Sequence, residues 1–349
     1  MKNIGFVSYW FNRGQAVVTR YVRSIFDDAG FDTHVLVRRA EMHGTNRGDW
    51  VSPNVTIGSK EYNMPVSTYV NWAKENDIEV CFFDQNYQFK AIRSVREMGV
   101  RTIGRFVWEQ FGEEHVGPAK SAFDNIYSLT RSEQERYNGL GIDSNLVRWG
   151  IHPSLFSVKA KRHKDNNVWF YYPAGYCSSR KSVKETVRAF SLVRSKNIRL
   201  LISSQKPIDT LGDSRIVVES GNVTFHSEFH KKMASCDVCI IPSRWEGLGL
   251  AFVEAMAFGM PIITTNHPPM SEYVVHGKSG LLVKSVLGSG LPNGLPVANI
   301  RVKDLSDKIS KLSNRALIDK MSKFTVNHGR KKYNWEDTRG DYLAMLRRD

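Results

Sequence analysis

Residues 242–265, PSRWEGLGLAFVEAMAFGMPIITT, decide the fold of this chain. They continue an apolar run over Val238–Ile241 that predicts a buried strand, and a glycine-containing loop separates this strand from a helix that begins at about Leu250. Gly259 ends the helix, and Pro261–Thr265 predicts the next strand. A strand, a loop, a helix and a second strand in this order predict one unit of a parallel α/β sheet.

The loop Glu246–Gly249 is the predicted binding edge, because ligands of such sheets lie beyond the carboxyl ends of the strands. The following helix offers unpaired N–H groups and a partial positive charge, worth about 0.3–1 kcal/mol to a nearby anion. Gly247 and Gly249 allow close approach to the backbone. Glu246 and Glu254 are suited to hold two sugar rings of one ligand, since a carboxylate accepts two hydrogen bonds from a vicinal diol. The alternative is that Glu254 is an ordinary exposed helix residue that binds no ligand. Its apolar neighbours disfavour this interpretation.

The same alternation runs through the whole chain and restarts once. In the first half, the predicted strands are Ile4–Ser8, His34–Val37, Val80–Asp84, Thr102–Val107 and Asn125–Leu129. In the second half, they are Val168–Tyr172, Leu200–Ser203, Val223–Phe225, Val238–Ile241 and Pro261–Thr265, with helices at 184–194, 229–235 and 250–258. Strand–helix alternation predicts parallel sheets covered on both faces by helices. We therefore expect an α/β protein of two doubly wound, Rossmann-like domains.

Polar segments indicate the domain boundaries. The lysine-rich segment Gly150–Lys164 is the predicted linker, which gives an N-terminal domain at 1–150 and a C-terminal domain at 151–334. The Gly/Pro-rich residues 286–299 are predicted to be a loop inserted in the second domain. A chain of 349 residues is long enough for two separate cores.

The net charge of +14 is unevenly distributed along the chain. Residues 1–150 hold 18 basic and 18 acidic side chains, whereas residues 151–349 hold 31 and 17, so the whole excess lies in the second half. Such an excess favours a polyanionic ligand, which leaves a nucleotide diphosphate, an anionic membrane or a nucleic acid open. A solvated lysine-rich surface is the alternative.

The four cysteines match neither a disulfide framework nor a zinc site. Cys81 and Cys177 stand alone, and Cys236 and Cys239 form a C-x-x-C without a second Cys or His pair at zinc spacing. Buried thiols and a reducing, cytoplasmic compartment are expected. The apolar stretch at the N-terminus is shorter than a signal peptide requires, so no signal peptide is expected. A glutamate and a glycine interrupt the longest apolar run, 247–263, so no membrane span is expected either.

Residues 238–283 resemble, almost element by element, the E-x7-E region of retaining GT-B glycosyltransferases of the glycosyl transferases group 1 type. Further similar segments are SLTRSEQERYNGLGI (128–142), RWGIHPSLF (148–156) and YYPAGYCSSRKSVKETVRAFSLV (171–193), so that the resemblance covers about two-thirds of the chain. It implies a GT-B fold, with two Rossmann-like domains facing across a cleft and a final helix, 335–349, that returns to the first domain. It also implies transfer of a sugar, of the hexosyl type, from a nucleotide diphosphate to an acceptor hydroxyl.

The resemblance implies roles for individual residues. Glu254 would bind the donor's ribose, Glu246 would hold the transferred sugar, and Lys181 would contact the diphosphate. The family has an arginine directly after the glycine at Gly175, where this chain has a tyrosine, and Arg180 is the candidate to supply that charge. The donor-binding residues expected are Gly14, Gln15, Gly175, Arg180, Lys181, Glu246, Gly247, Leu248, Gly249, Leu250 and Glu254.

The first domain is expected to hold the acceptor. Trp10, Arg105 and Trp108 are the predicted acceptor-binding residues, and Glu109 is the candidate to meet the acceptor hydroxyl, with a surface salt bridge as the alternative. Glu246, Lys181 and Glu109 are thus the predicted catalytic residues. Retention of the sugar's configuration is implied by the resemblance alone. No nucleophile stands out, so a same-face transfer is the expected mechanism. The sequence contains no D-x-D triplet, so neither a metal nor another cofactor is expected.

Three functions remain open at this point. The first is glycan, glycolipid or surface-polysaccharide synthesis from a UDP- or GDP-sugar, on a glycan or lipid-linked glycan acceptor and with contact to a membrane surface. The second is sugar transfer to modified bases of DNA, with which the charge of +14 is compatible. The third is a non-catalytic module that binds sugar nucleotides, motivated by the missing arginine.

Overall fold

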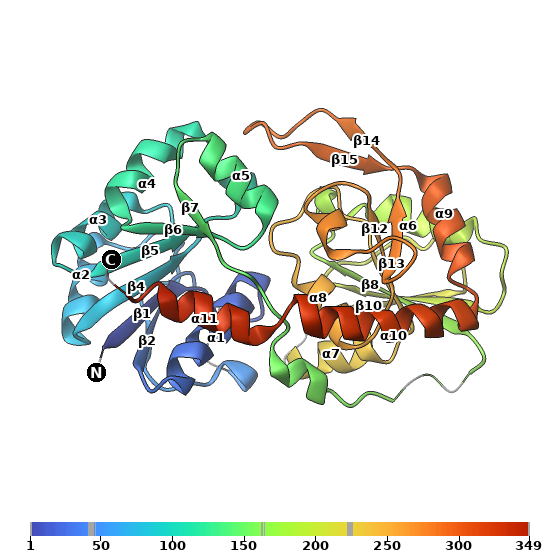
Figure 1. Cartoon of the computed structure of the whole chain (residues 1–349), viewed down its shortest axis with the longest axis horizontal. Coiled ribbons are helices and arrows are strands. Elements are labelled where there is room, and N and C mark those ends of the chain that lie inside the picture. Colours follow the sequence, from blue (N-terminus) through green and yellow to red (C-terminus); the bar gives the residue numbers. More distant parts are fainter. Residues whose placement is uncertain are drawn as a thin grey trace. The chain divides into compact units, whose positions relative to one another are not determined.

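The computed structural model describes residues 2–40, 45, 47–161, 163, 165–221 and 226–347, without the side chains of Trp108 and His226. The chain divides into two compact units (Figure 1). The N-terminal unit consists chiefly of the residues up to Trp149 and the segment from Glu336 on, and the C-terminal unit of most of Gly150–Trp335. Each unit is built on its own parallel sheet.

Among the described residues, seven parallel strands form the sheet of the N-terminal unit, in the order β3-β2-β1-β4-β5-β6-β7. They are β1 (Asn3–Ser8), β2 (Asp32–Val37), β3 (Val55–Ile57), β4 (Ile78–Asp84), β5 (Arg101–Arg105), β6 (Asn125–Ser128) and β7 (Ser144–Leu146). The helical segments of this unit are α1 (Gly14–Asp28), η1 (Gly48–Trp50), α2 (Val66–Glu75), α3 (Phe89–Glu97), η2 (Trp108–Gln110), η3 (Glu113–His115), α4 (Val116–Ala122) and α5 (Arg131–Gly139). The strand order reverses between β1 and β4, as in doubly wound sheets.

Aromatic packing around β1 and β4 forms the core of this unit. Phe6 of β1 stacks on Phe82 of β4 with ring centroids 5.4 Å apart, and Phe26 of α1 lies 5.2 Å from Phe82. Helix α11 (Trp335–Ala344), from the far end of the sequence, joins this core through Tyr342, which lies 6.2 Å from Phe82 and 5.5 Å from Tyr127. The strands are apolar on both faces because helices cover both.

In the described part of the C-terminal unit, six parallel strands follow the order β10-β9-β8-β11-β12-β13. They are β8 (Val168–Gly175), β9 (Ile198–Ser204), β10 (Ile216–Ser220), β11 (Val238–Ile241), β12 (Ile262–Thr265) and β13 (Gly280–Val283). The helical segments are η4 (Pro153–Ser157), η5 (Ser179–Lys181), α6 (Val183–Ser191), α7 (His226–Ala234), α8 (Leu250–Ala257), η6 (Met270–Tyr273), α9 (Val302–Lys311) and α10 (Arg315–Lys332). Here the strand order reverses between β8 and β11. The prediction of two doubly wound α/β sheets is therefore confirmed.

Two details of the predicted elements differ. The strand predicted at Val223–Phe225 lies outside the described residues, and the strand beside β9 is β10, earlier in the sequence. The loop predicted at 286–299 is wrong, because β14 (Ser285–Gly288) and β15 (Val297–Ile300) pair there as an antiparallel ribbon. Apart from Gly288, the last residue of β14, the glycines and prolines of this segment lie in the turn of the ribbon, where Gly294 has φ of +79°, and they obscured the two short strands that flank it.

Candidate functional site

The switch point of the C-terminal sheet brings two loops together. Strand β8 pairs directly with β11, with Phe170 opposite Val238 and Tyr171 opposite Cys239. Because the two strands are parallel, the loop after β8 and the loop after β11 leave the same edge of the sheet. The N–H of Arg244, in the second loop, donates to the carbonyl of Arg180, in the first, across 2.8 Å. Ligands of doubly wound sheets bind at such an edge.

Glu246 is the centre of a buried charge cluster formed by these loops. Lys181 Nζ lies 2.6 Å from Glu246 Oε1, Arg180 Nη1 pairs with Oε2, and Ser243 Oγ donates to Oε1 across 2.7 Å. Burial raises the pKa of Glu246, but Arg180, Lys181 and the hydrogen bonds from Lys181 and Ser243 outweigh it and lower the pKa to about 2. The carboxylate is therefore charged at neutral pH.

The two cations outnumber the carboxylate of Glu246. The Lys181 side chain is 14 % exposed and that of Arg180 is 27 % exposed, so the second is the more open to solvent. Burial lowers the pKa of Lys181, the charge of Glu246 raises it and that of Arg180 lowers it again, with a downward shift as the result. A largely buried cluster with surplus positive charge is suited to a phosphate group.

Backbone geometry positions the second loop. Gly249 adopts the left-handed conformation with φ of +65°, and a Cβ atom there would lie 2.7 Å from the Phe252 ring. Glycine is therefore required at this position. Gly247 and the buried Leu248 precede it, and Leu250 is the first residue of α8.

Gly175 and Leu248 take part in the two loops through their backbones. Gly175 is the last residue of β8 and has φ of +54°. The carbonyl of Leu248 accepts a hydrogen bond from the hydroxyl of Tyr273 in η6. The carbonyl of Gly175 in turn accepts a hydrogen bond from the N–H of Gln205 across 2.7 Å. Each of the two loops is therefore held by a hydrogen bond from a neighbouring segment.

Glu254 lies in the second turn of α8 and is buried rather than exposed, at 4 %. Its Oε1 atom lies 3.2 Å from His230 Nε2 of α7. His230 packs against the ring of Phe258, with centroids 5.8 Å apart. The sequence analysis did not single out His230. The available signal was its spacing of three residues from the buried Met233, which places a polar ring on the apolar face of α7.

A pocket of about 700 Å³ opens beside the first loop. Residues of the loop after β8, of α6 and of the segment 207–211 line it, with Arg244 at one side. Neither Glu246 nor Glu254 is among its lining residues. The pocket therefore adjoins the charge cluster without containing the two carboxylates.

In the N-terminal unit, Gln15 and Arg105 meet at Asp84, the last residue of β4. Gln15 Nε2 donates to the Asp84 carbonyl across 2.8 Å, and Arg105 Nη1 lies 3.2 Å from Asp84 Oδ1. Gly14, the residue before Gln15, begins α1. Arg105 is 3 % exposed, so its guanidinium is engaged in an internal ion pair.

Trp10, another predicted acceptor residue, lies in the core of the N-terminal unit. Trp10 is 1 % exposed and donates its indole N–H to the Trp50 carbonyl across 2.8 Å, so its ring belongs to the core. Glu109 is half-buried in η2. The side chain of Trp108, in the same turn, lies outside the described residues. The acceptor roles of these residues remain predictions, and the position of Trp10 gives its role no support.

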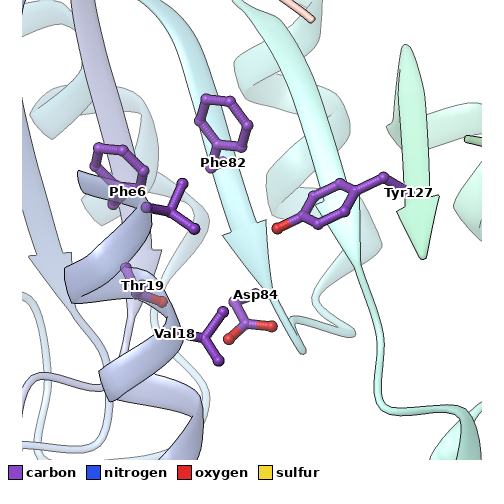
Figure 2. A pocket seen from close by; sticks show the side chains of 7 residues that line it. Phe6, Val18, Thr19, Phe82, Asp84 and Tyr127 are labelled. Carbon is purple, nitrogen blue, oxygen red and sulfur yellow. The ribbon is translucent and has the colours of Figure 1, made fainter. Parts of the chain in front are cut away.

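A small cavity lies below the carboxyl end of β4. Figure 2 shows the Tyr127 hydroxyl pointing toward it, with Asp84 at its edge and Phe6 and Phe82 on its apolar side. Burial raises the pKa of Asp84, while Arg105 and Arg38 lower it, and the shift is upward. These groups form an internal polar cluster of the N-terminal unit.

Two absences concern the described residues alone. No helix among them combines the length and the apolar character that crossing a membrane requires. No group of three or more His, Cys, Asp or Glu side chains among them is placed to hold a metal ion. Cys81, Cys177, Cys236 and Cys239 form no disulfide among the described residues.

Two doubly wound sheets, the second with a cationic switch point that contains a carboxylate, define a chain of the GT-B class. Sucrose-phosphate synthase from Thermosynechococcus elongatus matches with a TM-score of 0.75 over 99 % of this chain and 98 % of its own, at 14 % identity. HepE from Anabaena, solved in complex with UDP and glucose, matches with a TM-score of 0.74 over 99 % of each chain, at 12 % identity. These likenesses establish the fold.

The family resemblance is confirmed by sequence as well. Residues 170–289 match the family described as Glycosyl transferases group 1. The capsular polysaccharide biosynthesis glycosyltransferase CapM of Staphylococcus aureus is 26 % identical over 211 residues, which cover 54 % of this chain and 50 % of CapM. The chain spans about half the length of the curated relatives it matches. It thus carries a Glycosyl transferases group 1 segment within a GT-B fold.

Proposed function

We propose that this protein is a retaining glycosyltransferase that moves a sugar from a nucleotide diphosphate to an acceptor hydroxyl. The observation that supports this most is the cluster of Glu246, Arg180 and Lys181 at the switch point, with Glu254 eight residues further on. The cluster combines surplus positive charge, which suits a diphosphate, with a carboxylate that suits sugar hydroxyls.

When the donor binds, the side chains of the cluster would leave one another and contact the donor instead. Arg180 and Lys181 would turn from Glu246 to the diphosphate oxygens, and Glu246 would accept hydrogen bonds from the transferred sugar. The N–H groups at Gly249 and Leu250, at the start of α8, add a partial positive charge. Glu254 would hold the two ribose hydroxyls. Because the leaving diphosphate gains charge in the transition state, the two cations would contribute to catalysis as well as to binding.

The proposed transfer is direct and needs no metal ion. Two cations can neutralise the leaving group in place of a divalent ion. The acceptor hydroxyl would attack from the face that the diphosphate leaves, so the configuration of the sugar is retained. Glu109 stays the candidate to accept the hydroxyl's proton.

A UDP- or GDP-sugar is the proposed donor, and a glycan or lipid-linked glycan is the proposed acceptor. The UDP and glucose bound to HepE support a UDP-sugar, and the capsular polysaccharide role named for CapM supports a glycan acceptor. Four cysteines that form no disulfide with one another, three of them buried, support a cytoplasmic location, with contact to a membrane surface where the acceptor is lipid-linked.

Donor hydrolysis tests this proposal. Purified protein is incubated with UDP-, GDP-, ADP- and TDP-sugars, with and without EDTA, and release of the nucleotide diphosphate is measured. We expect release from one nucleotide class, unaffected by EDTA and reduced at least about tenfold in Glu254→Ala. No release from any donor by folded protein would instead indicate a binding module. Oligosaccharide, lipid-linked glycan and modified DNA acceptors are then compared, and the best of them identifies the acceptor class.

A further inference from the structure

His230 and Glu254 form a buried pair between two helices of the C-terminal unit. His230 Nε2 lies 3.2 Å from Glu254 Oε1, and the two side chains are 7 % and 5 % exposed. They come from α7 and α8, which flank strand β11 in the sequence. The pair is separate from the Glu246 cluster, whose cations come from the loop after β8.

A carboxylate that accepts hydrogen bonds from both hydroxyls of a diol must have its plane at a defined rotation. Glu254 has three rotatable side-chain bonds, and a hydrogen bond to one oxygen from a rigid ring restricts the last of them. The ring of His230 is itself fixed, because it packs against Phe229 and Phe258 with centroids 5.8 Å away in each case. Side chains that hold a binding group from behind determine how well that group is preorganised.

We propose that His230 is a positioning residue that orients Glu254 for the ribose of the donor and thereby sets the preference for ribonucleotides. The inference rests on the proposed function, in which Glu254 binds the ribose hydroxyls. With the Nε2–H tautomer, His230 donates to Oε1 and keeps the carboxylate plane fixed before the ligand arrives. Without this bond, the ligand would have to order the carboxylate itself. The cost would lower the affinity for nucleotides that carry the ribose diol and would leave the affinity for nucleotides without it unchanged.

A pair of matched variants separates this role from a purely structural one. His230→Gln places an amide nitrogen near the position of Nε2, whereas His230→Asn is one methylene shorter and cannot reach Glu254. Both replace the imidazole by a neutral amide, so they differ chiefly in the contact with Oε1. Thermal melts show whether each variant is folded.

The probes are UDP and GDP, each compared with its 2′,3′-dideoxy analogue, which lacks the diol. For the nucleotide that binds, we expect wild-type protein to prefer the ribose form by about tenfold or more. His230→Gln should keep this preference. His230→Asn should weaken the ribose form by about tenfold and leave the dideoxy form unchanged, so that the preference disappears. In turnover, His230→Asn should raise KM for the donor and leave kcat nearly unchanged.

Two failures are distinguishable. If folded His230→Asn keeps the ribose preference, or weakens both forms equally, the positioning role is overturned while the proposed function stands. If neither nucleotide binds to wild-type protein, or if Glu254→Gln keeps the ribose preference, the assignment of Glu254 itself is wrong and the inference falls with it.

Discussion

Glu246 owes its charge to two neighbours that are 65 and 66 residues away in sequence. A carboxylate with a side chain only 4 % exposed would otherwise favour its neutral form, and the lowered pKa shows that Arg180 and Lys181 more than compensate for burial. The same arrangement keeps both cations at the edge of the sheet, where a diphosphate would need them. Under the proposed function, Arg180 and Lys181 would already lie at this edge before the donor binds and would need only to turn toward the diphosphate.

Lys181→Met tests the catalytic share of the cluster. Removal of one donor to a developing oxyanion typically slows a reaction by about 10²–10³-fold, so we expect donor hydrolysis to fall by about a hundredfold. Lys320→Met is the matched control, because Lys320 is exposed on α10 and does not line the pocket beside the cluster, and its activity should stay within about twofold of wild type. Equal activities of the two variants in steady-state assays would contradict the role of Lys181.

The loop between β11 and α8 depends on Gly249 and on contacts from outside the helix. The left-handed conformation of Gly249 turns the chain so that α8 begins at the sheet edge. The β14–β15 ribbon supports this loop, because the N–H of Ala298 donates to the carbonyl of Arg244 across 2.9 Å. An element that the sequence analysis interpreted as a loop thus contributes to the geometry of the site.

Gly249→Ala should disturb both stability and function. An added Cβ is strained at φ of +65° and would lie 2.7 Å from the Phe252 ring, so we expect a loss of about 1–3 kcal/mol in the free energy of unfolding and at least tenfold weaker nucleotide binding. Urea unfolding and calorimetry measure the two effects. Gly139→Ala, on α5 where a Cβ meets nothing within 4 Å, is the control and should stay within about 0.5 kcal/mol of wild type. A Gly249→Ala protein as stable as this control would refute the argument.

At the scale of the whole molecule, the buried carboxyl group of Glu133 is expected to make the free energy of unfolding depend on pH. Glu133, 2 % exposed, accepts from the Leu129 N–H across 2.8 Å. Burial raises its pKa and Arg105 lowers it, with a result of about 7 against an ordinary 4.5. A carboxyl group whose folded-state pKa is raised contributes stability that is fully present below pH 4.5 and is lost as the pH rises through 7.

Glu133→Gln should remove this pH dependence. The shift of the Glu133 pKa from 4.5 to about 7 corresponds to a contribution on the order of 3 kcal/mol to the free energy of unfolding. Relative to wild type, the variant should therefore become more stable by up to about that amount between pH 5 and pH 8, as measured by urea unfolding at the two values. Glu135→Gln, exposed on the same helix, should show no such trend. A difference between wild type and Glu133→Gln that does not change with pH would contradict the assignment.

Much of the architecture followed from the sequence because local rules suffice for it. Buried strands of a parallel sheet are short apolar runs, and helices between them show a period of 3.6 residues, so β1, β4, β8 and β11 were all recognisable. Short strands such as β3 and β7 were missed, because three residues are too few to establish a pattern. The ribbon at 285–300 was missed because its glycines and prolines suggested a loop.

The sequence by itself determined the two parallel sheets, the glycine at position 249 and the placement of Glu246 and Glu254 on one loop and one helix. Only the tertiary structure decided the partners of the buried polar groups. Glu246 pairs with Arg180 and Lys181, and Glu254 with His230. The indole N–H of Trp10 donates to Trp50 rather than to a ligand. The reason is physical. Strand and helix patterns depend on residues within a few positions of one another, whereas the partner of a buried polar group is chosen by which distant segments the sheet order brings together.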